Sequence, residues 1–178
     1  QSAPASRGVL GNATALPLAD ASVDSLISNE VIADLDVAGA EHAQVAAALA
    51  KQVVDLLPAG AMYNLGAWQF VTEIARVLRP GGRAYVSEFG SPDEPPEEAV
   101  QLDHPEVSIH FGHLVQIAAA HGLRAALVPM GEVLDIDLGA PQMARHSWHA
   151  VRALAASRGQ HLRSRCWTPD DWRHSAPV

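Results

Sequence analysis

The chain has 178 residues, 48% of them apolar and 18% charged, a composition that is typical of one globular domain and excludes a disordered chain. Its formal net charge of −8 and its scattered Lys and Arg residues argue against nucleic acid as the principal partner. The single cysteine, Cys166, excludes an internal disulfide and a Cys-x-x-Cys metal site. No apolar run approaches the ~20 residues of a membrane span and no signal-peptide pattern opens the chain, so we expect a cytoplasmic protein without membrane contact.

The first third of the chain predicts a tail, a loop, a strand and a helix. Residues 1–7 are small and polar and form the expected tail, and the apolar run 8–11 is expected to end a strand. A loop follows, and residues 24–29 have the apolar character of a strand. Residues 41–57 are rich in Ala, Leu and Val without Gly or Pro, which predicts a helix that ends before Pro58.

The middle of the chain alternates helices and strands. Phe70, Ile74 and Val77 recur at the helical period and predict an amphipathic helix over 67–78, which stops at the turn signal Pro80-Gly81-Gly82. The next predicted elements are a buried strand over 84–89, a loop over 91–98, and a helix over 108–121 that closes at Gly122.

The last third continues this alternation. It predicts a strand over 123–130, a helix over 142–157, a strand over 161–167 and a helix start at 168–171. Strands that alternate with helices indicate an α/β domain with a largely parallel sheet and flanking helices. We see no second domain.

Two segments together resemble the class I methyltransferases, which use S-adenosylmethionine. Residues 11–24 follow the family order of a Gly-Asp-Ala-like start, a Leu-Pro loop and an acidic turn before a strand, with Asn12 in place of the family's Asp. Residues 73–83 read Glu-Ile-Ala-Arg-Val-Leu-Arg-Pro-Gly-Gly-Arg and resemble the family's helix, tight turn and next strand. The resemblance implies a Rossmann-like sheet in which the two motifs border neighbouring strands, with S-adenosylmethionine as cofactor.

The cofactor loop of the family is not found in this sequence. Class I methyltransferases begin with a strand, a Gly-x-Gly loop, a helix and a second strand, a unit of roughly 30 residues or more. Only eleven residues precede Asn12, and no Gly-x-Gly occurs in the chain. We therefore expect residues 8–178 to be the C-terminal portion of a methyltransferase domain, apparently without the first strands. Three explanations for the absent loop remain: an N-terminal segment is missing, a separate chain supplies it, or the protein is a degenerate relative without activity.

The resemblance places adenine recognition at Asn12 and Ala13. In the family, an Asp at the first position accepts a hydrogen bond from the adenine amino group, and the next backbone N–H reaches a ring nitrogen. Asn12 can accept through its amide oxygen, although it lacks the charge. The alternative interpretation is an Asn that caps the backbone of its own loop.

The strand ends supply the candidates for the reactive centre. Ligands of open α/β sheets bind at the carboxyl ends of the strands, where this sequence has Asn29, Glu30 and, one strand later, Glu88. By resemblance, Asn29 faces the methionine end of the cofactor, while Glu30 is a catalytic and Glu88 a substrate-binding candidate. Asn29, Glu30 and Asp34 also resemble the narrower MidA-like group, which implies a protein side chain such as arginine as methyl acceptor. Two carboxylates suit a guanidinium; the alternative is that both are solvated loop residues.

Two further residues are candidates on the acceptor side. His110 and His113 are three residues apart on a predicted helix and share a face, and His110 is the candidate base because histidine titrates near neutral pH. His-x-x-His alone does not define a metal site, so no metal is predicted. Tyr63 precedes a helix and is a candidate for lining the acceptor pocket. The alternative is that the histidines and Tyr63 only pack against their neighbours.

The sequence therefore predicts methyl transfer from S-adenosylmethionine to a small molecule or a protein side chain. Such a transfer is an in-line displacement on a sulfonium carbon, for which an enzyme contributes mainly proximity and alignment. The rival prediction is a catalytically inactive scaffold of the same fold. Exposed sheet edges favour pairing or self-association in that case.

Overall fold

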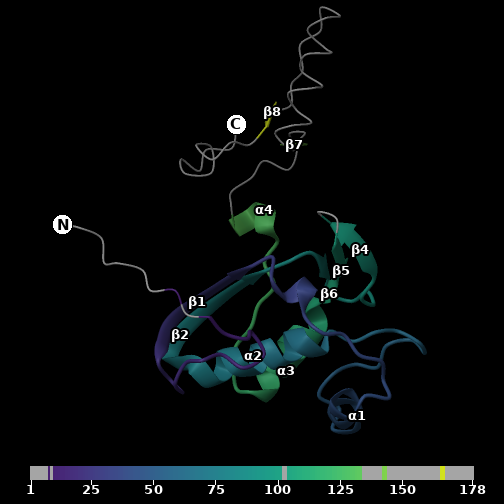
Figure 1. Cartoon of the computed structure of the whole chain (residues 1–178), viewed down its shortest axis with the longest axis horizontal. Coiled ribbons are helices and arrows are strands. Elements are labelled where there is room, and N and C mark those ends of the chain that lie inside the picture. Colours follow the sequence, from purple (N-terminus) through teal and green to yellow (C-terminus); the bar gives the residue numbers. More distant parts are fainter. Residues whose placement is uncertain (1–7, 9, 102–103, 134–141, 144–164, 167–178) are drawn as a thin grey trace, which may run out of the picture. The chain divides into compact units, whose positions relative to one another are not determined.

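A computed structural model describes residues 8, 10–101, 104–133, 142–143 and 165–166 of the chain. The chain divides into two units, Gln1–Leu127 and Val128–Val178. The described part of the first unit is a mixed α/β structure of helices and short, mostly parallel strands (Figure 1). The predicted α/β class is confirmed at this level.

One parallel strand pair organises the first unit. β1, Val23–Asn29, pairs with β2, Leu78–Ser87, and Asn29 lies opposite Ser87 at the carboxyl ends. The Pro-Gly-Gly segment at 80–82, predicted as a turn, lies within β2, where the register with β1 shifts near the amino ends. The strand predicted over 24–29 is confirmed, and the two motif segments do border neighbouring strands.

Side chains of this strand pair alternate between a covered and an open face. Leu26 and Val86 pack against the apolar core. Ile27 and Tyr85 lie opposite each other on the other face and are 78% and 57% exposed. The prediction of a buried strand over 84–89 is therefore wrong in two respects, because β2 ends two residues earlier and only one of its faces is covered by helices.

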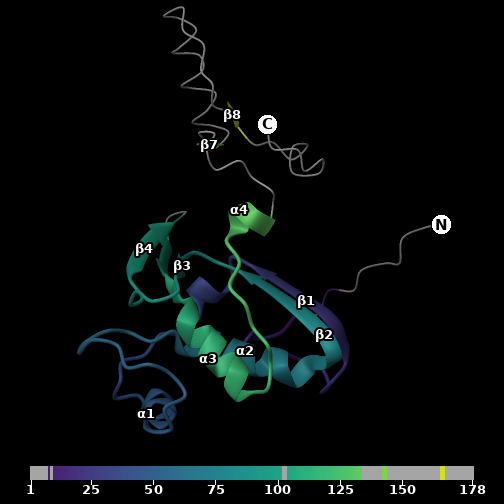
Figure 2. The same cartoon turned by 180° about the vertical axis from the view of Figure 1, so that it is seen from behind.

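Two helices lie on the covered side of the strand pair (Figures 1 and 2). α2, Leu65–Val77, buries the predicted apolar stripe, and α3, Phe111–Ala120, packs beside it. Gly122 follows α3 with a φ of +77°, the left-handed conformation that closes a helix. Both predicted helices are confirmed. Among the described helices, none combines the length and the apolar character needed to cross a membrane.

α1, Ala43–Ala50, is shorter than the helix predicted over 41–57. The chain leaves the helix through Gln52, whose φ of +54° is left-handed. This turn brings Val54 and Leu57 into the core. Burial of these two apolar side chains therefore overrides the helix propensity of the segment.

Short elements follow the carboxyl ends of β1 and β2. A 3₁₀ turn, η1 (Ile32–Asp34), comes after β1. After β2, β3 (Gly90–Ser91) pairs in parallel with β6 (Ile109–His110), and β4 (Glu98–Gln101) pairs antiparallel with β5 (His104–Val107). The acidic loop predicted after β2 is thus flanked by two small strand pairs.

Two predicted strands are not formed. Residues 123–129 have no strand pairing, and the next residue begins the short helix α4, Met130–Val133. Gly8 and Leu10 are also outside any strand, and the Leu10 side chain is fully exposed. A strand needs a neighbour for its backbone N–H and C=O groups, and apolar composition alone does not provide one.

The described part of the second unit beyond α4 is one short strand pair. β7, Gln142–Met143, pairs in parallel with β8, Arg165–Cys166. The strand predicted over 161–167 is confirmed at 165 and 166, whereas 142 and 143 form a strand instead of the start of the predicted helix. The rest of the helix predicted over 142–157, the helix start at 168–171 and the tail lie outside the described residues.

Candidate functional site

The carboxyl ends of β1 and β2 bring four polar residues to one edge of the sheet. Asn29 ends β1, and its side-chain oxygen accepts a hydrogen bond from the Ser87 hydroxyl at 2.6 Å. Glu30 follows, and its N–H donates to the Ser87 carbonyl at 3.0 Å. Glu88 comes directly after Ser87. Asn29, Glu30 and Glu88 therefore lie at the ends of adjacent paired strands, as the sequence predicted.

The two carboxylates at this edge have different surroundings. Glu88 is half-buried; one of its oxygens accepts the Ala33 N–H at 3.3 Å and the other accepts the Phe89 N–H at 3.0 Å. Glu30 is exposed and has a φ of +51°, a left-handed conformation that costs a non-glycine residue about 1 kcal/mol. Backbone donors therefore fix the Glu88 carboxylate, while the Glu30 carboxylate is open to solvent.

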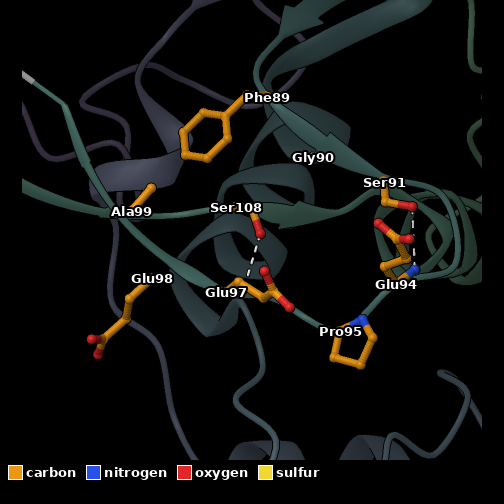
Figure 3. A pocket seen from close by; sticks show the side chains of 9 residues that line it. All are labelled: Phe89, Gly90, Ser91, Glu94, Pro95, Glu97, Glu98, Ala99 and Ser108. Atoms are coloured by element: carbon orange, nitrogen blue, oxygen red, sulfur yellow. Dashed lines mark hydrogen bonds between the residues drawn. The ribbon is translucent and has the colours of Figure 1, made fainter.

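A pocket of about 330 Å³ lies next to this edge, where the chain continues from β2 (Figure 3). Its lining residues are Phe89, Gly90, Ser91, Glu94, Pro95, Glu97, Glu98, Ala99 and Ser108. The Ser108 hydroxyl accepts the Glu97 N–H at 2.9 Å, and the Ser91 hydroxyl accepts the Glu94 N–H at 3.3 Å. Figure 3 shows the Glu98 carboxylate pointing away from the other lining residues. The two serines therefore hold an acidic loop at the pocket.

This pocket was not predicted from the sequence. Four acids among residues 93–98, directly after a strand, were the available signal. The pocket depends, however, on the pairing of β3 with β6, which joins residues 90–91 to residues 109–110. A two-residue strand pair leaves no periodic pattern from which it can be predicted.

His110 and His113 stack on each other at the start of α3. Their ring centroids are 3.8 Å apart and their planes differ by 15°. His110 caps the helix, because its Nδ1 accepts the His113 N–H at 3.2 Å. His113 is 0% exposed, and neither of its ring nitrogens has a hydrogen-bond partner. Burial lowers the pKa of both rings, to about 4 for His113, so both are neutral at neutral pH.

This geometry limits what the candidate base can do. A neutral His110 whose Nδ1 accepts a hydrogen bond carries its proton on Nε2. The ring therefore offers a donor, and it becomes a base only if it releases the His113 N–H. His110 is buried, two residues from the pocket residue Ser108.

Tyr63 lies in the apolar core. It is 1% exposed, and its ring stacks on His113 at 5.7 Å and meets Trp68 edge-on at 5.7 Å. Its hydroxyl accepts the Leu57 N–H at 3.1 Å. Tyr63 is not among the residues that line the pocket. Its contacts are those of a packing residue.

Asn12 and Ala13 lie in the loop that precedes β1. The side-chain oxygen of the exposed Asn12 accepts both the Thr14 N–H and the Thr14 hydroxyl at 2.9 Å. The loop is held to α2, because the Leu16 N–H donates to a Glu73 carboxylate oxygen at 2.8 Å. The local capping that the sequence left open as an alternative is present. A ligand that donated a hydrogen bond to the same Asn12 oxygen would have to share this oxygen with Thr14.

Asn64 is a buried polar residue that the sequence did not single out. An Asn directly before a helix predicts an N-cap, but this side chain makes no capping hydrogen bond. Its Oδ1 accepts the His110 N–H at 2.9 Å, and its Nδ2 donates to the Ser108 carbonyl at 3.0 Å. Asn64 thus binds the backbone of the segment that forms the pocket wall.

A charged network at the other end of α2 was also missed. Arg76 forms ion pairs with Glu73 at 2.6 Å and with Asp20 at 2.7 Å, and it donates to the carbonyls of Leu16 and Leu18. Glu73 and Arg76 belong to the second motif, yet nothing in the motif shows that they hold the loop of the first.

Comparisons of the chain with protein-family models, with curated proteins and with solved structures find no match. In the part of the chain that the structure describes, no three His, Cys, Asp or Glu side chains are grouped so that they could hold a metal ion. The features that bear on function are therefore the sheet edge, the pocket and the motif segments.

Proposed function

We propose that this chain is part of an S-adenosylmethionine-dependent methyltransferase with a Rossmann-like sheet that contains β1 and β2. The observation that carries the proposal is the parallel pairing of these strands, with Asn29, Glu30 and Glu88 following their carboxyl ends. Ligands of α/β sheets bind at such an edge. The two segments that resemble the family flank the same strands.

In this proposal, two parts of the first unit bind different ends of the cofactor. Asn29 faces the methionine end, and Asn12 with Ala13 contacts adenine. In the family, a Gly-x-Gly loop binds the remainder of the cofactor.

The charges near the sheet edge favour a cationic methyl acceptor. Glu30 and Glu88 follow the strand ends, and Glu94 and Glu97 line the neighbouring pocket. Carboxylates bind a guanidinium through paired, charge-assisted hydrogen bonds. A protein arginine and a small cationic molecule both fit this chemistry.

Methyl transfer to a guanidinium forms an N–C bond while the sulfonium C–S bond breaks, and the acceptor nitrogen releases one proton. The products are S-adenosylhomocysteine and the methylated acceptor. The exposed carboxylate of Glu30 is the proton acceptor in this proposal, and Glu88, which backbone donors hold in place, orients the guanidinium. His110 takes the proton only if it first releases the His113 N–H.

Isothermal titration with S-adenosylmethionine tests the cofactor half of the proposal. We expect binding in the micromolar range, weakened about tenfold in Asn29→Ala by the loss of one polar contact. Gln44→Ala, on the exposed side of α1, is the control and should bind like the wild type. Lack of binding by this chain and also by its full open reading frame, each shown to be folded, would refute the proposal.

The second candidate is a scaffold without catalysis, and the exposed Ile27–Tyr85 pair favours it. Apolar sheet surface that water contacts is typical of an association site. Sedimentation velocity distinguishes the candidates. Concentration-dependent association that Tyr85→Glu abolishes, together with no cofactor binding, supports the scaffold.

A further inference from the structure

A column of aromatic rings surrounds the two histidines at the start of α3. His113 lies between His110, at 3.8 Å, and Tyr63, at 5.7 Å, and all three rings are nearly parallel. Trp68 meets His113 at 79°. Both ring nitrogens of His113 lack a hydrogen-bond partner although the residue is fully buried. An imidazolium at this position would lose its contact with water, and this desolvation outweighs the support that the Asp55 backbone gives the charged ring.

The histidine pair also joins the pocket wall to the core. The His110 N–H donates to Asn64, and Ser91 of β3 pairs with His110 of β6. The Gly112 N–H, in the first turn of α3, donates to the Pro92 carbonyl at 3.0 Å. Segment 90–92, which borders the pocket, is therefore held by the residues that the two rings keep in place.

The charged groups that face the pair do not offset its burial. Asp55, in the loop after α1, acts on both histidines, and Asp93, in the loop after β3, acts on His110. Both carboxylates favour the charged imidazoles, yet desolvation is the larger effect for each ring. Tyr63 and Trp68 also contact the His113 ring.

We propose that the stacked His110–His113 pair is an acid-sensitive latch on the pocket. Protonation of His110 at Nδ1 removes the acceptor of the His113 N–H, and protonation of His113 puts a desolvated charge into the aromatic column. Either event releases the first turn of α3 from segment 90–92 and opens the pocket wall. The latch is a property of the packing, and it does not depend on the identity of the ligand that the pocket binds.

The direction of the pH effect follows from proton binding. Between the usual histidine pKa of 6.5 and the value of about 4 in the fold, the open chain binds a proton at His113 and the closed one does not. Stability is therefore complete above pH 6.5 and falls as the pH decreases toward 4. The largest effect of this one residue on the opening constant is about 300-fold, the difference of 2.5 in pKa expressed as a ratio.

Urea unfolding of the whole chain between pH 7.5 and 4 tests the latch. We expect the unfolding constant of the wild type to rise with acid much more steeply than that of His113→Phe, which keeps a stacked ring but cannot titrate. His42→Gln, an exposed histidine at the start of α1, should behave like the wild type. Equal pH dependence of the wild type and His113→Phe would overturn the proposal.

Hydrogen exchange of the wild type provides the second test, which needs no variant. The amides of His110, Gly112 and His113 should lose protection near pH 5, while the amides of Thr72 and Ile74 in α2 keep theirs. Protection in α3 and α2 that falls in parallel, or that persists in both down to pH 4, would show that the first turn of α3 does not open separately.

Discussion

At the scale of single residues, the buried polar side chain of Asn64 is expected to have a large effect on stability. It is 2% exposed, and its amide satisfies one backbone donor and one backbone acceptor of the segment 108–110. Asn64→Ala leaves the buried His110 N–H and the half-buried Ser108 carbonyl without partners, at about 1–3 kcal/mol for a fully buried group. We expect a loss of about 2–4 kcal/mol in the free energy of unfolding, measured in urea.

Gln69 is the matched control for Asn64, since it lies five residues further along and its side-chain hydrogen bond to Gln44 is exposed. Gln69→Ala should cost less than about 0.5 kcal/mol. If the two alanine variants had equal stability, the amide of Asn64 would not hold the pocket wall.

Glu73 is the second residue whose removal should be measurable. It accepts hydrogen bonds from Arg76 and from the Leu16 N–H, and its side chain is 15% exposed. Glu73→Ala should cost about 1–3 kcal/mol, because the loop before β1 loses its anchor on α2. Asp24→Ala, which removes the partner of Arg79 in an exposed ion pair, should cost less than about 1 kcal/mol.

The contribution of Glu73 also depends on pH. The hydrogen bond from Arg76 lowers the pKa of Glu73 below its usual value of 4.5. Its stabilising effect is therefore complete above pH 4.5 and is lost as the pH falls through the lower value in the fold. Thermal unfolding at neutral and at acid pH should show the cost of Glu73→Ala shrinking with acid, whereas a constant cost would contradict the Arg76 interaction.

At the scale of elements, the sequence predicted those whose periodicity and packing agree. The 3.6-residue period of Phe70, Ile74 and Val77 predicted α2 because that stripe is the buried face. Composition alone failed over 41–57, where Val54 and Leu57 are buried by a turn at Gln52 rather than by a longer helix. An Ala-, Leu- and Val-rich composition without Gly or Pro favours a helix, but it does not show where the rest of the core lies.

The backbones of β3 and β6 approach each other closely at Gly90. A Cβ at Gly90 would lie 2.1 Å from the Ile109 carbonyl oxygen and 2.7 Å from its nitrogen. Gly90→Ala should therefore separate the two strands, cost about 1–3 kcal/mol and perturb the pocket that Gly90 lines. Chemical shifts of the 108–110 amides measure that perturbation.

Gly122→Ala separates backbone strain from close approach. Both glycines have a positive φ, +155° at Gly90 and +77° at Gly122, but a Cβ at Gly122 meets nothing within 4 Å. The substitution should cost about 1–2 kcal/mol and leave the 108–110 shifts unchanged. Similar shifts in both variants would mean that β3 and β6 are not held as closely as the structure shows.

At the scale of the whole molecule, the candidate site was predictable only in part. Strand ends follow from local sequence, so Asn29, Glu30 and Glu88 could be placed at neighbouring ends once two strands were assumed to be adjacent. The pocket could not be predicted, because it needs contacts between residues 90–91 and 109–110 that no local pattern encodes. The burial of Tyr63, His110 and His113 could not be predicted either, because it also depends on contacts between segments far apart in the sequence.

The same substitution is expected to have different costs on the covered and open sides of the β1–β2 pair. Ile74 of α2 is 3% exposed in the core, and Ile74→Ala should cost about 2–5 kcal/mol, the loss of transfer energy plus a cavity. Ile27→Ala makes the same change on the open face and should cost less than about 0.5 kcal/mol. Urea unfolding measures both.

A cost for Ile27→Ala that approaches the cost for Ile74→Ala would contradict the open face, and its concentration dependence would identify the cause. If that cost grows with protein concentration, a second copy covers Ile27 and Tyr85, because only an association equilibrium depends on concentration. If it is the same at every concentration, polypeptide of the same chain covers the face. The first result would favour the scaffold, and the second would support a larger sheet with helices on both sides, as a methyltransferase requires.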